Sequence, residues 1–278
     1  MNGKFFSKKE ASISVFDRGF LFSDSVYEVT AVIGGSLVDW REHFARLIRS
    51  LDHLDLVNNF QEEDFYQIQK KLIKENKLKE GLCYVQVTRG VAERDFNFAK
   101  SSVSPTLVIF TQEKLILRNP ACKVGIKIIT VPDNRWRRRD IKTTQLLAQS
   151  LAKTHAVQEG VDDSLLVQGG FINEGSSSNV FIFKDERIIT PSLSRDILGG
   201  ITRSSVIKFC QINNIEIKQQ EINIDDLMNA QEVFLTSATG FVLPVIEVNG
   251  RHVGNGLVGD MVKKIQLIYI NQIKAKLS

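Results

Sequence analysis

The sequence contains few cysteines and no long apolar run. Its three cysteines, Cys83, Cys122 and Cys210, are far apart and lack any Cys-x-x-Cys pair. An odd, scattered set argues against a disulfide framework or a zinc knuckle and favours a reducing cytoplasm. The first ten residues carry charges where a signal peptide has its apolar core, and no stretch approaches about 18 apolar residues. The sequence therefore predicts a cytoplasmic location and no membrane span.

Motifs of several common enzyme classes are also missing. The four histidines lack metal-ligand spacing, no serine lies in a Gly-x-Ser-x-Gly elbow, and no Gly-Lys-Ser/Thr motif indicates a nucleotide P-loop. Residues 254–259 match Gly-x-Gly-x-x-Gly, but too few residues follow for the strand and ribose-binding acid of a dinucleotide fold. This segment is interpreted as a turn. We expect no metal site, and the net charge of +4 does not by itself indicate nucleic acid.

Length and composition are typical of a two-domain globular protein. The 278 residues correspond to two domains at about 150 residues each, and 43% are hydrophobic and 24% charged. Asn119-Pro120 interrupts the periodic pattern. We expect a smaller N-terminal α/β domain over 1–115, a linker over 116–122 and a larger C-terminal cofactor-binding domain over 123–278.

Hydrophobic periodicity predicts alternating helices and strands. A Gly34-Gly35 pair between two β-rich runs predicts a hairpin. We therefore expect compact α/β domains with mixed sheets. Helical spacing of apolar residues predicts helices at 42–56, 62–78, 143–159, 204–213 and 260–276. β-rich runs predict strands at 13–16, 26–33, 36–40, 82–88, 106–111, 123–131, 164–168, 180–183, 187–190, 233–236 and 245–248.

An amine and an acid stand out as candidate catalytic groups. A lysine after a basic run is usually solvated, but Lys142 stands where a loop meets an amphipathic helix, and partial desolvation there would free its amine to form an imine. Glu174 by itself would be a surface acid. Small hydrogen-bonding residues at 175–179 follow it, however, and such a turn suits a ring-sized ligand whose pyridine nitrogen the acid keeps protonated.

A third segment, 198–203, opens a predicted helix with two glycines and a hydroxyl. Free N–H groups at a helix start attract phosphate, and glycine lets the phosphate approach the backbone. An ordinary turn with Thr202 as the N-cap is the alternative interpretation.

Together these segments resemble the class IV, or fold type IV, pyridoxal-phosphate-dependent aminotransferase family. The resemblance is closest to the D-amino acid aminotransferases, through 84–94 and 136–142. It implies a two-domain fold type IV enzyme with mixed sheets, flanking helices and pyridoxal 5'-phosphate between the domains. It also implies a homodimer and a ping-pong transfer of the amino group from D-alanine to 2-oxoglutarate. The similar segments are 16–29, 43–47, 87–90, 140–142, 173–179 and 200–203.

The same resemblance implies roles for individual residues. Lys142 is expected to form the imine with the cofactor, and Glu174 to pair with its pyridine nitrogen. Arg46 is expected to bind the phosphate together with the backbone of Ile201 and Thr202. Further cofactor-binding residues implied by the resemblance are Ser178, Leu198, Gly200 and Ala238.

The resemblance also implies substrate-binding residues, and the chain departs from the family pattern at one substrate-binding and one cofactor-binding position. Tyr27 is expected to face the cofactor and substrate, and Arg94 to bind the substrate carboxylate. Phe96 stands where the D-amino acid aminotransferases have a histidine, so the carboxylate site is altered. Ala238 stands where a hydroxyl residue is expected near the phosphate.

Three other functions remain open from the sequence. An aminodeoxychorismate lyase and an L-branched-chain aminotransferase share the fold and cofactor. A polyanion-binding protein would use the basic run at 135–139 with Trp136 on nucleic acid. The run is short, and basic groups beside a phosphorylated cofactor are expected in any case.

Overall fold

The computed structural model describes residues 1–57, 59–98 and 103–277, and the chain divides into two compact units. The first unit consists of Met1–Lys114 and Ile141–Gln145, and the second of Leu115–Asp140 and Leu146–Ser278. The sequence-based boundaries differ, because they placed 141–145 in the C-terminal domain. This segment joins the first unit since the Tyr27 N–H donates to the Lys142 carbonyl oxygen at 3.0 Å.

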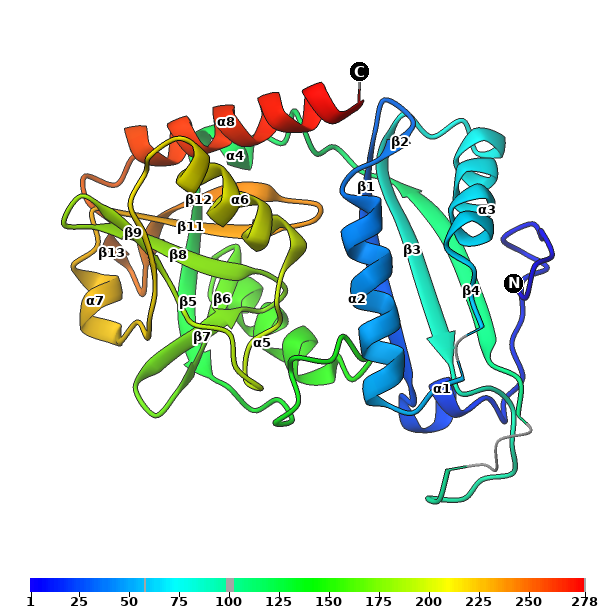
Figure 1. Ribbon diagram of the computed structural model, residues 1–278. Coiled ribbons are helices and arrows are strands. Elements are labelled where there is room, and N and C mark those ends of the chain that lie inside the picture. Colours follow the sequence, from blue (N-terminus) through cyan, green and yellow to red (C-terminus); the bar gives the residue numbers. More distant parts are fainter. Residues whose placement is uncertain (58, 99–102, 278) are drawn as a thin grey trace. The chain divides into compact units, whose positions relative to one another are not determined.

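The first unit contains a four-stranded antiparallel sheet in the order β2-β1-β3-β4 (Figure 1). Gly34 and Gly35 have φ angles of 60° and 83°, which confirms the predicted turn between β1 and β2. The strands are β1 (Ser25–Ile33), β2 (Ser36–Leu37), β3 (Glu80–Thr88) and β4 (Thr106–Glu113). The helices are α1 (Arg18–Phe22), α2 (Trp40–His53) and α3 (Glu62–Glu75).

Helices α2 and α3 give this sheet its hydrophobic core. Helix α2 packs on β1 and α3 on β4, each through one apolar face. One core cluster unites Ile73 of α3 with Val32 of β1 and Cys83 of β3. The side chains that carry candidate functions in this unit therefore project from a packed scaffold of helix on sheet.

The second unit contains a nine-stranded mixed sheet in the order β10-β9-β8-β11-β12-β5-β6-β7, with β13 paired to β12. Three strand pairs are parallel, namely β12 with β5, β5 with β6, and β9 with β10. The strands are β5 (Ile126–Pro132), β6 (Asp163–Gln168), β7 (Phe171–Gly175), β8 (Asn179–Lys184), β9 (Arg187–Thr190), β10 (Ile217–Gln219), β11 (Glu232–Ser237), β12 (Phe241–Val248) and β13 (Arg251–His252). The helices are α4 (Ala121–Val124), α5 (Leu147–Gln158), α6 (Ile201–Ile212), α7 (Ile224–Met228) and α8 (Asp260–Leu277).

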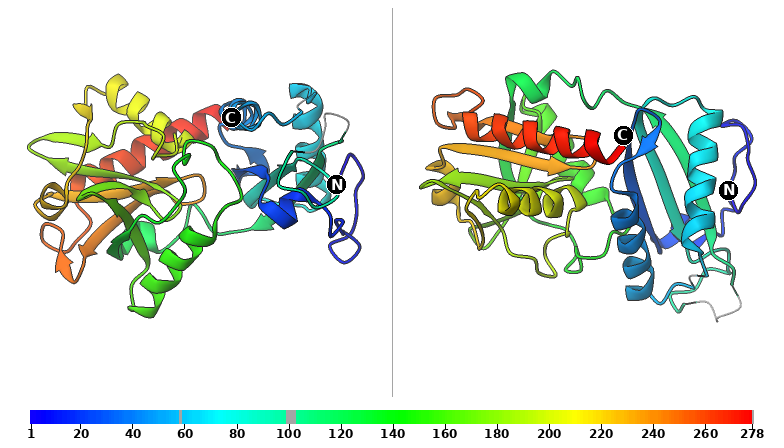
Figure 2. Two further views of the ribbon diagram at one scale, coloured as in Figure 1. Left: turned by 90° about the horizontal axis from the view of Figure 1, so that it is seen from below. Right: turned by 45° about the horizontal axis from the view of Figure 1, so that its top comes forward.

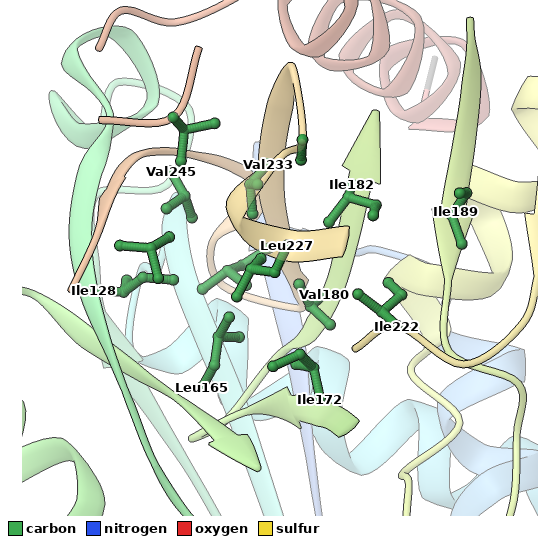
Figure 3. Close-up of a cluster of buried hydrophobic side chains, with 14 of the residues drawn as sticks. Ile128, Leu165, Ile172, Val180, Ile182, Ile189, Ile222, Leu227, Val233 and Val245 are labelled. Carbon is green, nitrogen blue, oxygen red and sulfur yellow. The ribbon is translucent and has the colours of Figure 1, made fainter. Parts of the chain in front are cut away.

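The sheet of the second unit is buried on both faces. Val180 and Ile182 of β8 point into an aliphatic cluster that Leu227 of α7 completes (Figure 3). Phe181, between them, points to the opposite face and stacks on Phe234 at 4.8 Å between ring centroids. Helices α6 and α8 lie along β11 and β12 (Figure 2). Double burial explains why the sequence of β8 is apolar without alternation.

Several local expectations were wrong for physical reasons. Residues 13–16 form no strand, because the Ser14 hydroxyl accepts a bond from the Phe16 N–H and replaces a ladder contact. The turn predicted at 175–179 is shorter, since Gly175 belongs to β7 and Asn179 to β8. Helix α6 begins at Ile201 with Gly200 as its N-cap, so Thr202 is not the cap. The five-residue helices α1 and α7 are too short for periodicity to reveal.

Cys83, Cys122 and Cys210 are all free thiols. Among the described residues, no helix combines the length and apolar character needed to cross a membrane.

Candidate active site

Glu174 is the central acidic group of the second unit. It lies at the end of β7 with 4% of its surface exposed. Its Oε1 accepts a bond from Arg135 Nη1 at 2.5 Å, and its Oε2 accepts bonds from Asn179 Nδ2 at 3.1 Å and from the Leu198 N–H at 3.2 Å. A carboxylate with this many donors is fixed in orientation.

Two opposite effects act on the ionisation of Glu174: a neighbouring cation favours the charged form, and burial disfavours it. Burial raises the pKa of Glu174, whereas the Arg135 guanidinium and the Leu198 N–H lower it, and the net direction is upward from the ordinary glutamate value. Asp133, which also pairs with Arg135, adds to the upward shift. A further positive partner would lower this pKa and favour the ionised form.

Asn179 joins Glu174 to the start of α6. Its amide Nδ2 donates to Glu174 Oε2 and to the Leu198 carbonyl oxygen, the latter at 2.8 Å. Gly200 is required beside it, because a Cβ at position 200 would overlap Asn179 Oδ1. The N–H groups of Ile201 and Thr202 follow in the first turn of α6, where a helix provides no intrahelical acceptors. One side chain thus brings a buried acid and an anion-attracting helix start together.

Two hydroxyls near this junction have no hydrogen-bond partner within the described residues. They belong to Ser178, in the turn after β7, and to Thr236 of β11. Thr236 is the register partner of Asn179 across β11 and β8. Ala238 lies in the turn between β11 and β12, just past that pair. Buried hydroxyls without a partner are uncommon in proteins. These two hydroxyls can therefore still form hydrogen bonds with a polar ligand.

Lys142 is positioned by the first unit. Its carbonyl oxygen accepts the Tyr27 N–H, and its own N–H donates to the Ser50 hydroxyl at 3.5 Å. Its Nζ lies 4.2 Å from the centroid of the Tyr27 ring. Tyr27 in turn stacks on Tyr84 at 5.6 Å. The ammonium group is thus placed over an aromatic face that stabilises its positive charge.

Arg46 lies in a buried ion cluster of the first unit. Its Nε and Nη2 donate to the two oxygens of Glu28 at 2.7 and 2.8 Å, and His43 Nδ1 lies 2.7 Å from Glu28 Oε2. Burial by itself raises the pKa of Glu28, but Arg46 and His43 outweigh it and hold that pKa well below its usual range. Glu28 therefore stays ionised and fixes the guanidinium of α2 against β1.

Arg94 and Phe96 lie in the segment after β3, close to α1. The Arg94 guanidinium carbon is 5.4 Å from the Phe22 centroid and 5.5 Å from the Phe96 centroid. The backbone is held by Arg18, whose Nη1 donates to the Asp95 carbonyl oxygen at 2.6 Å. Phe96 is 80% exposed. The two residues are adjacent in space, with an aromatic ring where a hydrogen-bonding group was expected from the family pattern.

The structure joins some of the expected residues directly. Glu174, Leu198 and Gly200 meet around Asn179, while Lys142 meets Tyr27. The supporting residues Glu28, Asp133 and Asn179 were not singled out from the sequence. Asn179 could have been found, because it ends the small-residue segment. Glu28 and Asp133 carry no local signal.

The basic run at 135–139 has a different role from polyanion binding. The side chains of Arg135 and Arg139 are only 6% and 3% exposed, and both are paired with Asp133. Buried and paired guanidinium groups are not available to a nucleic acid. The polyanion-binding interpretation therefore loses two of the four arginines on which it rested.

Comparisons with known proteins agree on one family. The model of the family described as amino-transferase class IV matches residues 25–248. A D-alanine aminotransferase of Staphylococcus aureus (strain MSSA476) is 37% identical over 268 residues, covering 96% of this chain and 94% of the relative. The T.th. branched-chain amino acid aminotransferase with pyridoxamine 5'-phosphate superposes with a TM-score of 0.89 at 25% identity, covering 98% and 92% of the two chains. A putative 4-amino-4-deoxychorismate lyase of Legionella pneumophila has a TM-score of 0.85 at 22% identity, covering 95% and 96%, and shows the fold alone.

Proposed function

Because the chain belongs to the class IV aminotransferase family, whose members depend on pyridoxal phosphate, we propose that it transfers the amino group of a D-amino acid to a 2-oxo acid. D-alanine and 2-oxoglutarate are the proposed pair. The observation that carries the choice of substrate is the 37% identity to a D-alanine aminotransferase over 96% of this chain.

The residues of the second unit fit pyridoxal phosphate in three respects. A buried carboxylate, Glu174, suits a protonated ring nitrogen, and the first turn of α6 at Ile201 and Thr202 suits a phosphate. The hydroxyls of Ser178 and Thr236 have no partner within the described residues and supply donors for a polar ligand. Leu198, Gly200 and Ala238 are proposed to line the same ligand.

Lys142 is the proposed catalytic base. When bound, pyridoxal phosphate supplies an aldehyde carbon and an electron-withdrawing ring that stabilises the charge released from the amino acid Cα. Lys142 Nζ would carry the proton from that Cα to the carbon that the cofactor supplies. It would carry a proton in the opposite direction when the 2-oxo acid reacts in the second half of the ping-pong cycle. The Tyr27 ring beside Nζ orients the amine for this transfer. Glu174 holds a negative charge at the ring nitrogen, and Arg46 is proposed as a further phosphate ligand.

Arg94 is the proposed anchor of the substrate carboxylate. A guanidinium binds a carboxylate through two parallel hydrogen bonds, which fixes the orientation of the substrate. Phe96 cannot donate a hydrogen bond, so in this pair Arg94 alone provides polar recognition. The Phe22 and Phe96 rings near Arg94 restrict its guanidinium instead. We propose a homodimer, and the cytoplasmic location stays a prediction.

The test is the visible absorbance of the purified protein with pyridoxal phosphate. We expect a band at about 410 nm from the imine on Lys142. D-alanine should bleach this band, and 2-oxoglutarate should restore it. Lys142→Ala should lack the band, whereas the control Lys127→Ala should keep it, because the Lys127 side chain is half exposed and pairs with Glu247.

Each alternative gives a different outcome in the same experiment. An L-branched-chain aminotransferase would be bleached by L-leucine in preference to D-alanine. A lyase would release pyruvate from aminodeoxychorismate without any need for 2-oxoglutarate. A protein that forms no band at all would overturn the proposed function.

A further inference from the structure

A row of buried charges runs from Asp133 through Arg135 to Glu174. The three side chains are 0%, 6% and 5% exposed. Arg135 donates from Nε and Nη2 to the two oxygens of Asp133, at 2.9 and 2.8 Å, and from Nη1 to Glu174. One guanidinium therefore bridges two carboxylates, with both of its edges occupied.

Asp133 is fixed independently of Arg135. It directly follows β5, and its N–H donates to the Val167 carbonyl oxygen of β6 at 2.8 Å. Its Oδ2 accepts a bond from Asn173 Nδ2 at 2.9 Å, and Asn173 is the neighbour of Glu174 in β7. Asp133 is thus tied to both strands of the hairpin that carries Glu174, and it presents the guanidinium at a set position.

A second arginine strengthens this anchor. Arg139 Nη1 lies 3.2 Å from Asp133 Oδ2 and 2.9 Å from Asp196 Oδ1. The same nitrogen donates to Gln168 at 2.8 Å. Asp196 lies in the loop that leads from β9 to α6. The charge row is therefore connected to the segment that ends at the start of α6.

The charges around Glu174 act in opposite directions. Arg135, Arg139 and Arg203 of α6 favour its ionised form, because each interacts with it as a cation. Asp133 opposes ionisation through its own negative charge, and so does burial. Arg135 is the only one of the three arginines with a hydrogen bond to Glu174 in the described part of the chain. The effect of Asp133 on Glu174 must then have two parts, one through its charge and one through the position of Arg135.

We propose that Asp133 and Arg135 are positioning residues that keep Glu174 ionised and oriented as the acceptor for the protonated ring nitrogen of the cofactor. The identity of the ligand rests on the proposed function. The arrangement of the three side chains does not, because it exists in the chain itself. Asp133 acts on Glu174 by holding Arg135 in position. In this proposal, that effect favours ionised Glu174 more strongly than the negative charge of Asp133 opposes it.

The test is the titration of Glu174 in the protein without cofactor, followed by ¹³C NMR of labelled glutamate carboxyl groups and assigned with Glu174→Gln. Arg135→Met should raise the pKa of Glu174 by about 1 or more, a tenfold change in its proton affinity. Arg135→Lys should raise it less, because the charge remains but the two-edged contact is lost. The matched control Arg138→Met should leave it unchanged, since Arg138 pairs with Asp140.

Asp133→Asn separates the two effects by sign. If Asp133 positions Arg135, the pKa of Glu174 rises in this variant. If Asp133 acts only as a charge, the pKa falls, and the positioning role is overturned. Should Arg135→Met not fold, as judged by circular dichroism, Arg135→Lys and Asp133→Asn still decide the question. An unchanged Glu174 titration in both would refute the proposal.

A second measurement connects the charge row to the ligand. Pyridoxamine phosphate should bind Arg135→Lys at least about tenfold more weakly than the wild type, which corresponds to about 1.4 kcal/mol. Binding to Arg138→Met should be unchanged. If the titrations behave as expected but the protein forms no absorbance band with pyridoxal phosphate, the proposed function fails while the role of Asp133 and Arg135 stands.

Discussion

Single buried carboxylates control the positions of the cationic side chains in both units. Glu28 receives two bonds from Arg46 and one contact from His43, and its pKa lies far below the ordinary value. Glu174 shares Arg135 with Asp133, and its pKa lies above the ordinary value. Both glutamates are almost completely buried. Burial raises both pKa values, and at Glu28 the contacts with Arg46 and His43 outweigh it. At Glu174 the contact with Arg135 does not, and the negative charge of Asp133 adds to the upward shift.

Removing the charge of Glu28 should destabilise the folded protein. Glu28→Gln leaves the Arg46 guanidinium buried beside a neutral amide, and the loss of one partner of a buried ion pair costs about 3–5 kcal/mol. The free energy of unfolding in urea at pH 7 measures this difference. Glu75→Gln is the control, because Glu75 is exposed on α3 and should change stability by less than about 0.5 kcal/mol.

The wild type and Glu28→Gln should also differ in how their stability depends on pH. Because the pKa of Glu28 is depressed in the folded state, its contribution is present above the unfolded pKa of about 4.3 and is lost as the pH falls below it. The stability difference between wild type and Glu28→Gln should therefore shrink below about pH 4. A difference that stays constant from pH 7 to acid would contradict the depressed pKa.

At the scale of elements, the start of α6 combines a backbone requirement with a side-chain contact. Gly200 has an ordinary φ of −66°, so the backbone alone does not require glycine. The requirement comes from Asn179, whose Oδ1 occupies the space of a Cβ. Asn179 cannot move freely, because it bonds to Glu174 and to Leu198. The strand β8 and the helix α6 are therefore coupled through one amide.

Gly200→Ala should weaken cofactor binding by displacing Asn179. We expect the affinity for pyridoxamine phosphate to fall by at least about tenfold, or about 1.4 kcal/mol, as measured by calorimetric titration. Gly199→Ala is a matched control, because its added methyl would lie 3.6 Å from Leu193, an ordinary contact. Equal affinities for the two variants would show that Asn179 does not connect the helix start to the ligand.

At the scale of the whole molecule, each unit has its own hydrophobic core, and exposed aromatic side chains remain on the first unit. Phe20, Phe96 and Phe98 are 66%, 80% and 59% exposed. Large exposed apolar groups of this kind favour association with another protein surface. The proposed homodimer offers such a surface.

Sedimentation equilibrium should give a mass of about 63 kDa, twice the 31.4 kDa of one chain. Substituting Phe98 and Phe20 with serine should shift the protein toward the monomer if these side chains contribute to association. The control Arg118→Ser, at an exposed position elsewhere on the chain, should leave the mass unchanged. A wild-type mass of one chain at micromolar concentration would rule out the homodimer.

Much of the fold and part of the site could be predicted from the sequence, because the decisive signals are local. Apolar spacing over one or two turns predicted α2, α3, α5, α6 and α8 to within a few residues. The order of short segments along the chain, with Lys142 and Glu174 among them, indicated the family that the comparisons identify. These features depend on neighbours in sequence, which a periodic pattern records directly.

Only the tertiary structure decided which charges support the candidate site. Arg135 and Glu174 are 39 residues apart, and the Lys142 backbone pairs with Tyr27 of β1 at a still greater separation. Whether an arginine in a basic run is solvated or buried depends on the strands that fold around it. Asp133 and Glu28 have no periodic or motif signal, because an ion pair requires only proximity in space and loss of water. Sequence therefore determined the elements and the chemical groups, while packing determined which groups meet and in which charge state.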